Sequence, residues 1–151
     1  MAAQVDTDNW RAHLLETPNQ LRKLLENTRR IAVLGIKPDQ QQPACYVPEY
    51  AEQAGYEIVP VPVYYKELTE MHGHKVYRKL TDIPGDIDMV NVFRRPGDIP
   101  PHVEDIIAKK PKSVWFQLGI RNDAAAEQIA RAGIDVVQDK CLLVELQRIG
   151  R

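Results

Sequence analysis

The chain has 151 residues, of which 44% are hydrophobic and 27% charged, the composition of one ordinary globular domain. Its 20 Lys and Arg against 21 Asp and Glu give a net charge of -1, so overall charge does not favour binding to nucleic acid or anionic membranes. No apolar run suits a transmembrane helix, and residues 1–9 lack the apolar centre of a secretory signal. Two widely separated cysteines match no zinc spacing, so we expect a reduced, cytoplasmic protein.

The first 29 residues predict a helical extension ahead of the core. The sequence Thr17-Pro18-Asn19-Gln20 has the pattern of a helix start, with Thr as the N-cap, Pro at the first helical position and Gln where a capping box needs it. Leu21, Leu24 and Leu25 then form an apolar stripe along one face. The stripe predicts that this helix packs against the body of the protein.

Apolar runs that end in glycine or polar loops predict five strands buried on both faces, at residues 30–35, 56–63, 87–93, 113–117 and 134–137. Helices are expected between and after them, at about 43–54, 98–110, 122–133 and 141–148. Pro60 and Pro62 donate no hydrogen bond and suit a strand edge or end. The stretch 64–84 is the least regular, with a short edge strand expected around Val76-Tyr77.

This alternation predicts an α/β fold built from right-handed βαβ units. We expect residues 1–151 to form a single three-layer, doubly wound Rossmann-like domain, with a mostly parallel five-stranded sheet in the order 3-2-1-4-5. Ligands of such sheets bind beyond the carboxyl ends of the strands, where the strand order reverses. The loops 35–42 and 93–97 are the expected walls of that crevice.

The residues at these walls suit a polyanionic ligand such as a diphosphate. Gly35 allows a tight turn, and the helix beginning near Pro43 would direct unpaired amides at the crevice. Lys37, Arg94 and Arg95 would add three positive charges. The alternative is that Lys37 and one arginine are only solvated.

Two common nucleotide sites are not supported. The first turn reads GIKPDQ, without the GxGxxG of a dinucleotide site, and the second strand ends in Val61-Pro62-Val63, without the acidic residue that would bind a ribose. No GxxxxGK[ST] phosphate loop is present, which argues against ATP hydrolysis.

Four segments carry a resemblance to a known family. They are IAVLGIKPD at 31–39, VNVFRRP at 90–96, VWFQLGIRN at 114–122 and DVVQDKC at 135–141. With this order and spacing, the chain resembles the small stand-alone CoA-binding proteins, which are similar to the CoA-binding domain of succinyl-CoA synthetase alpha subunits. The resemblance implies a Rossmann-like domain that binds coenzyme A across the strand ends, with its phosphates near the Gly35 turn.

The resemblance also implies the residues that line the cleft. Together with the positions identified above, the candidate CoA-binding residues are Gly35, Ile36, Lys37, Pro43, Val61, Pro62, Phe93, Arg94, Arg95, Gln117, Leu118 and Gly119. The chain departs from the family pattern at 43–46 and 61–65, where it reads PACY and VPVYY. Contacts to the adenosine half are therefore expected to differ.

The sequence favours binding over catalysis. No Ser–His–Asp arrangement can be assembled, and no GxSxG motif is present. Cys45 lies near a helix start, where a thiol can be activated, but a small structural residue is the favoured interpretation. The pair His72 and His74 has no cysteine or carboxylate placed for it in the sequence, so no metal site is predicted.

All six tyrosines lie between residues 46 and 77, and tyrosine-rich surfaces favour protein interfaces. The alternative function is therefore a protein-interaction module, natural or engineered, on a CoA-binding scaffold. Its expected contact residues are Tyr46, Tyr64, Tyr65, Met71 and His72. The competing interpretation is that the tyrosines pack within the chain.

Overall fold

A computed structural model describes residues 7–151 of the chain. The central strands are β1 (Arg30–Leu34), β2 (Glu57–Val61), β5 (Met89–Val92), β6 (Ser113–Phe116) and β7 (Asp135–Val137), and a separate hairpin consists of β3 (Glu70–Met71) and β4 (His74–Lys75). The α-helices are α1 (Pro18–Glu26), α2 (Pro43–Gln53), α3 (Pro100–Lys109), α4 (Asp123–Arg131) and α5 (Leu142–Arg148). Three short 3-10 helices complete the list: η1 (Thr7–His13), η2 (Leu80–Asp82) and η3 (Pro96–Asp98).

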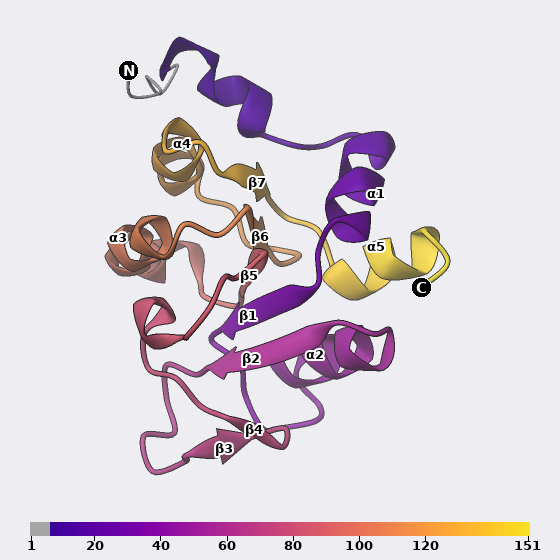
Figure 1. Ribbon diagram of the computed structural model, residues 1–151, viewed down its shortest axis with the longest axis vertical. Coiled ribbons are helices and arrows are strands. Elements are labelled where there is room, and N and C mark those ends of the chain that lie inside the picture. Colours follow the sequence, from indigo (N-terminus) through magenta and orange to yellow (C-terminus); the bar gives the residue numbers. More distant parts are fainter. Residues whose placement is uncertain (1–6) are drawn as a thin grey trace.

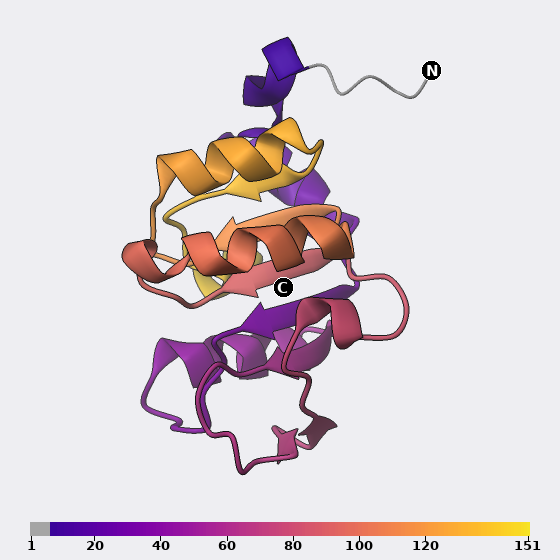
Figure 2. The same ribbon diagram turned by 90° about the vertical axis from the view of Figure 1, so that its left-hand side faces the viewer.

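The five central strands form one sheet in the order β2-β1-β5-β6-β7, and every pair is parallel. Figure 2 shows the arrowheads of β1, β5, β6 and β7 pointing the same way. The three-layer Rossmann-like fold and its five-stranded parallel sheet are confirmed. The predicted strand order 3-2-1-4-5 is wrong, because the third strand, β5, pairs with β1 and not outside β2.

Proline explains why β2 stays at the edge. Pro60 is the fourth of the five residues of β2, and its carbonyl accepts a 3.0 Å hydrogen bond from the N–H of Tyr77, outside the sheet. In a parallel strand the N–H and C=O of one residue point to the same side, so the N–H that Pro60 lacks would also have faced outward. A further strand on that side would have missed this donor, which confines β2 to the edge.

Helices cover both faces of the sheet, with α3 and α4 on one side and α1, α2 and α5 on the other (Figure 1). Strand side chains alternate between two cores, as the two-residue period of a strand requires. In β6, Val114 and Phe116 join the core under α3 and α4, and Trp115 joins the opposite core. The sheet is therefore buried on both faces, as its apolar runs predicted.

The segment after β2 forms a small outer layer. Its hairpin, β3 and β4, lies beside β2 and α2 at the lower end of Figure 1. The edge strand predicted around Val76-Tyr77 is displaced by two residues, since β4 ends at Lys75 and Tyr77 makes one main-chain contact to β2. The hairpin brings the 70–75 segment against α2, from which it is distant in sequence.

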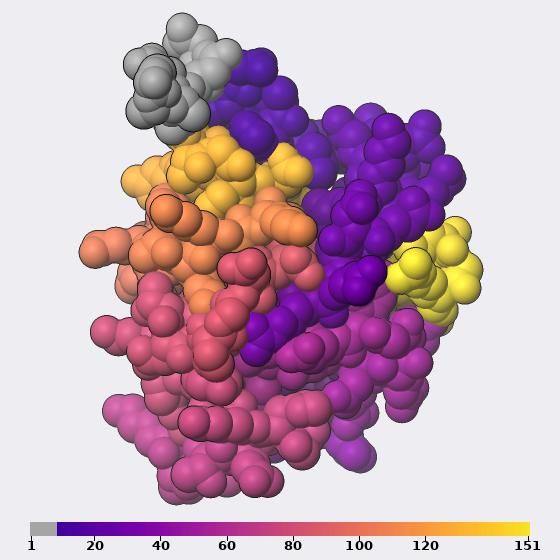
Figure 3. Space-filling view, in the orientation of Figure 1, coloured from indigo at the N-terminus to yellow at the C-terminus, as the bar shows by residue number. Residues whose placement is uncertain are grey.

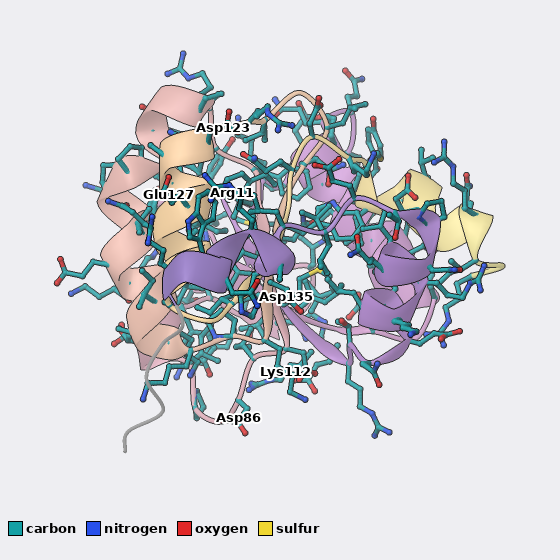
Figure 4. The ribbon with its side chains drawn as sticks, turned by 90° about the horizontal axis from the view of Figure 1, so that it is seen from above. Arg11, Asp86, Lys112, Asp123, Glu127 and Asp135 are labelled. Carbon is teal, nitrogen blue, oxygen red and sulfur yellow. The ribbon has the colours of Figure 1, made fainter. Side chains whose placement is uncertain are left out.

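The N-terminal extension packs across the top of the sheet, and its residues 1–6 lie outside the part that the structure describes. Thr17 and Gln20 form the predicted capping box at the start of α1. Trp10 is 9% exposed and lies between the guanidinium groups of Arg11 and Arg131, 4.4 and 5.2 Å from its ring. Figures 3 and 4 show η1 lying over α4.

Within residues 7–151, none of the helices has the length and hydrophobicity that crossing a bilayer requires.

Candidate functional site

The carboxyl ends of the parallel strands gather five loops at one edge of the sheet. The strand order reverses between β1 and β5, because the chain runs from β1 outward to β2 and then returns to β5 on the other side. The loops 35–42 and 93–97 follow these two strands and flank the reversal point. The corrected strand order thus leaves both predicted walls in place, since each follows a strand at the new reversal point.

Gly35 joins three strands at this point. Its N–H donates to the carbonyl of Val61 at 2.9 Å, and the N–H of Phe93 donates to the carbonyl of Leu34 at 2.8 Å. With φ at +89°, Gly35 adopts a conformation that favours glycine, and a Cβ there would lie 2.3 Å from the carbonyl oxygen of Phe93. The close approach of the two loops therefore requires glycine.

The loop after Gly35 leads into an α2 terminus that no side chain caps. The N–H of Lys37 donates to the carbonyl of Ala44 at 3.1 Å, which folds the loop back on the helix. The N-cap residue Gln42 makes no side-chain cap hydrogen bond, and Pro43 occupies the first turn. The Lys37 side chain is partly exposed beside this terminus. A positive helix end and a nearby ammonium group favour an anion.

The two arginines that follow β5 differ sharply. The Arg94 side chain is 14% exposed, whereas that of Arg95 is 85% exposed. Arg94 contacts the Tyr64 hydroxyl at 3.4 Å and Asp98 at 3.8 Å, and its buried Nε has no hydrogen-bond partner. Arg95 forms only an exposed pair with Asp98 at 3.3 Å. Arg94 is the more ordered of the two, held by Tyr64 and Asp98 against the loop after β5, so it is the stronger candidate to contact a ligand.

Two neighbouring groups respond to the Arg94 charge. A hydrogen bond from Arg94, together with its positive charge, lowers the pKa of the exposed Tyr64 hydroxyl. Burial lowers the pKa of His102, and the Arg94 charge lowers it further. Both shifts favour a neutral imidazole and a more acidic phenol. The Arg94 charge therefore reaches side chains on both sides of the loop after β5.

The Gln117 side chain is buried and forms hydrogen bonds within the protein. It is 4% exposed, and its side-chain carbonyl accepts hydrogen bonds from the N–H of Leu142 at 3.3 Å and from the amide of Asn91 at 3.4 Å. These contacts tie β5 and β6 to the start of α5. The Asn91 side-chain oxygen, fully buried, has no partner. The Gln117 side chain is thus already engaged within the protein.

The remaining candidates separate by burial. Ile36, Val61 and Pro62 are buried, so they present only main chain at this edge. Phe93 is partly exposed, and Leu118 is 65% exposed. The structure brings all twelve candidates to the carboxyl edge, although several contribute scaffold and not an exposed side chain. Those with exposed or partly exposed side chains are Lys37, Pro43, Phe93, Arg94, Arg95 and Leu118.

The predicted tyrosine surface is smaller than its sequence suggested. Tyr46 and Tyr64 are 42% and 51% exposed, whereas Tyr65 is partly buried against the core. Met71 is 4% exposed, and the His72 side chain is 8% exposed. The expectation that Met71 and His72 lie on the surface is therefore wrong, because the hairpin packs their side chains against α2.

Sequence reasoning missed a cluster beside the Gly35 loop. Cys45 Sγ lies 3.6 Å from His72 Nε2, and Glu49 Oε2 lies 3.9 Å from His72 Nδ1. The expectation that no cysteine or carboxylate accompanies the histidines is wrong, and His74 likewise pairs with Glu52. Cys45 and Glu49 are four residues apart and share one face of α2. That spacing was the available signal.

The thiol in this cluster is not activated. Burial raises the pKa of Cys45, and the negative charges of Glu49 and Asp39 raise it further. Cys45 is 1% exposed. The protein on its own therefore holds a neutral thiol here, in agreement with the favoured structural interpretation.

A separate hollow lies at the opposite end of the sheet. It encloses about 310 Å³ between α1 and the first residues of β6 and β7, with Leu24, Lys112, Ser113 and Asp135 among its lining residues. The face of the molecule that contains this hollow is turned toward the viewer in Figure 3. Amino ends of parallel strands are not where such sheets bind ligands, and none of the predicted site residues lines it. The carboxyl edge remains the candidate site.

Comparisons with known proteins agree with this fold. A family model described as a CoA binding domain matches residues 29–147. The uncharacterized protein YneT of Bacillus subtilis (strain 168) is 32% identical over 125 residues, which cover 83% of this chain and 90% of that protein.

Two solved structures are similar over nearly the whole domain. Cell-free ID.343 from Thermus thermophilus has 36% identity and a TM-score of 0.83, covering 89% of this chain and 99% of its own. The PH1109 protein redesigned for binding has 31% identity and a TM-score of 0.83, covering 90% of this chain and 94% of its own.

Proposed function

Because this chain belongs to the CoA-binding domain family, matched over residues 29–147, we propose that it binds coenzyme A or an acyl-CoA at the carboxyl edge of its sheet. The family match is the observation that carries the proposal. The strand order supports the proposed location, because ligands of parallel α/β sheets bind where the order reverses, here between β1 and β5.

The residues at this edge fit the phosphates of coenzyme A. The positive end of α2, which no side chain caps, and the charge of Lys37 both favour an anion at this edge. The 14% exposed Arg94 side chain brings a guanidinium group to the same edge, and guanidinium groups form charge-assisted hydrogen bonds with phosphates. The exposed Leu118 offers apolar contact at the same edge.

We assign this site a binding role without catalysis. Cys45, the thiol beside the Gly35 loop, is buried with a raised pKa, so it is a poor nucleophile. Coenzyme A would bring its own thiol as the reactive group, with the protein supplying attachment. Cys45 and Cys141 are both free thiols, which supports a reducing, cytoplasmic setting.

Titration calorimetry with coenzyme A and with NAD tests the proposal. We expect saturable binding of coenzyme A and none of NAD. Arg94→Ala should weaken coenzyme A binding by about 1.5–3 kcal/mol, the value of a hydrogen bond to a charged group, or roughly 10–150-fold in Kd. Arg95→Ala is the matched control, since its side chain is 85% exposed and should matter less.

Two results would contradict the proposal. Tight NAD binding without coenzyme A binding would exclude the ligand class. Equal and negligible effects of the two arginine variants would remove Arg94 from the site, provided that thermal unfolding shows both variants folded.

A second candidate function rests on Tyr46 and Tyr64, which are 42% and 51% exposed near the same edge. Exposed tyrosines suit a protein interface, where each could contribute about 2 kcal/mol or more if central. The double variant Tyr46→Ala/Tyr64→Ala should then abolish capture of a protein partner while leaving the melting temperature unchanged. A lowered melting temperature with unchanged capture would show that the rings only pack within the chain.

A further inference from the structure

The cluster of Cys45, Glu49 and His72 combines three metal-ligating side chains from two segments of the chain. Cys45 and Glu49 lie one turn apart on α2, and His72 comes from the turn of the β3–β4 hairpin. One ligand atom from each residue lies within 4.8 Å of the other two. Folding thus brings together a thiol, a carboxylate and an imidazole that the sequence separates by up to 27 residues.

The spacing of the donor atoms matches a tetrahedral ion. With Zn–S near 2.3 Å and Zn–N near 2.1 Å, a tetrahedral site places sulfur and nitrogen about 3.6 Å apart. Cys45 Sγ and His72 Nε2 are 3.6 Å apart. The Lys37 carbonyl oxygen lies 3.2 Å from the same nitrogen, close to the roughly 3.4 Å expected between oxygen and nitrogen ligands. Glu49 Oε2 lies 3.9 Å from the other ring nitrogen, Nδ1, and the 38% exposed Glu49 side chain would complete the set by turning toward Nε2.

The surroundings hold the donors in place and leave room for an ion. His72 has φ at +55° as the first residue of the two-residue turn between β3 and β4, and its ring contacts Cys45 of α2. A cavity of about 300 Å³ adjoins the cluster, with Pro38, Gln40, Glu70 and the three ligand residues among its lining. The nearby carboxylates of Asp39 and Glu70 favour a cation over an anion here.

The donor types decide which cation fits. A thiolate with an imidazole suits zinc or a similar transition metal, whereas magnesium and calcium prefer oxygen ligands. A catalytic triad is the competing interpretation of a cysteine, a histidine and a carboxylate. However, Cys45 is 1% exposed, so its sulfur is closed to a substrate, whereas a small ion can reach it from the adjoining cavity. The Lys37 carbonyl oxygen, 3.2 Å from His72 Nε2, is a further donor that a metal ion would use and a triad would not.

We propose that Cys45, Glu49 and His72 form a binding site for Zn²⁺ or a similar transition-metal ion, with the Lys37 carbonyl oxygen as a neighbouring donor. On binding, the thiol releases its proton to solvent and the thiolate ligates the metal, while the neutral imidazole carries its proton on Nδ1 and ligates through Nε2. The ion would fix the hairpin to α2 and hold the loop that carries Lys37. This inference does not rest on the proposed binding of coenzyme A, although both sites use the loop that carries Lys37.

The test uses Co²⁺ as a spectroscopic probe of the reduced full-length protein, freed of metal and of coenzyme A. Removing coenzyme A matters because its own thiol could ligate the probe. We expect one Co²⁺ per chain, with thiolate-to-metal charge-transfer absorption that Zn²⁺ abolishes. Cys45→Ser should eliminate this absorption. His72→Gln should weaken binding by at least about tenfold, since even an outer-shell partner is worth 10–100-fold in metal affinity.

Matched controls separate this site from the other thiol and the other nearby histidine. Cys141→Ser and His74→Gln should keep the absorption, because Cys141 lies at the start of α5 and His74 pairs with Glu52. Circular dichroism checks the fold of every variant. If the Cys45 variant does not fold, Glu49→Gln replaces it and should also weaken Co²⁺ binding about tenfold.

Three outcomes would overturn the proposal: no saturable Co²⁺ binding, charge-transfer absorption that persists in Cys45→Ser, or absorption lost in Cys141→Ser instead. Coenzyme A titration of the metal-free protein is measured separately. If the protein binds coenzyme A but no Co²⁺, this inference is refuted and the proposed function stands.

Discussion

Gly35→Ala tests how tightly the loops after β1 and β5 approach each other. The added Cβ would lie 2.3 Å from the Phe93 carbonyl oxygen and 3.3 Å from Arg94 Cδ. The first of these neighbours is main chain, which cannot swing aside as a flexible side chain can. Accommodation therefore requires the ends of β1 and β5 to move apart.

Two costs add at this position. An alanine at a φ of +89° loses about 1–2 kcal/mol from the left-handed conformation. Forcing a methyl group into a packed region costs about 1–3 kcal/mol more. Gly133→Ala isolates the first cost, because Gly133 has φ at +84° and a Cβ there meets nothing within 4 Å. We expect a total loss of about 2–5 kcal/mol for Gly35→Ala and about 1–2 kcal/mol for Gly133→Ala.

Urea unfolding followed by circular dichroism measures both variants against the parent protein. Equal slopes with denaturant would show that the shift in midpoint reports stability alone. If Gly35→Ala is no less stable than Gly133→Ala, the close approach at the reversal point does not constrain the fold, and the argument from the Phe93 carbonyl is wrong.

Partial burial acts to raise the pKa of Asp88, but hydrogen bonds from the main-chain N–H groups of Arg30 and Arg29 outweigh it and lower the pKa overall. A lowered folded-state pKa stabilises the protein above the usual carboxyl range, and this contribution disappears as the pH falls through the folded value. Asp88→Asn should therefore cost about 1–2 kcal/mol at neutral pH, and the difference should shrink as the pH falls through the folded-state pKa of Asp88. A pH-independent difference in urea unfolding would contradict this. Thr17→Ala removes the 3.2 Å hydrogen bond that Thr17 Oγ1 accepts from the N–H of Gln20 and should lower the free energy of unfolding by about 1 kcal/mol. Thr17→Ser keeps a hydroxyl and should retain most of that stability. Equal losses in the two variants would show that the cap does not matter.

The sequence alone was sufficient for the fold class. Apolar runs such as 31–34 and 113–116 are strands because only burial on both faces suits so many branched and aromatic side chains. Thr17 and Gln20 are local signals, since a capping box depends on residues three apart. The family could be predicted for a related reason: its motifs are short, and their order along the chain is preserved.

The order of the strands could not be predicted from the sequence. The prolines of β2 suggested an edge, yet the strand was expected inside the sheet, between the first and third strands. The deciding fact is the side to which the main chain of one residue points: the Pro60 carbonyl faces outward and accepts from the N–H of Tyr77. Along a strand, the N–H and C=O groups of successive residues point to alternate sides. Which side Pro60 faces therefore depends on the register of β2 with β1, and no local sequence pattern specifies that register.

Side-chain positions at the carboxyl edge depended on tertiary structure most of all. Composition cannot distinguish the 14% exposed Arg94 from the 85% exposed Arg95, which are adjacent in sequence. Gln117 was expected to line a cleft, but its side chain bonds to α5. Cys45 meets His72 only because the hairpin folds against α2. The sequence determines which chemical groups are available, and the packing of distant segments determines which of them meet, because that choice depends on the free energy of the whole fold.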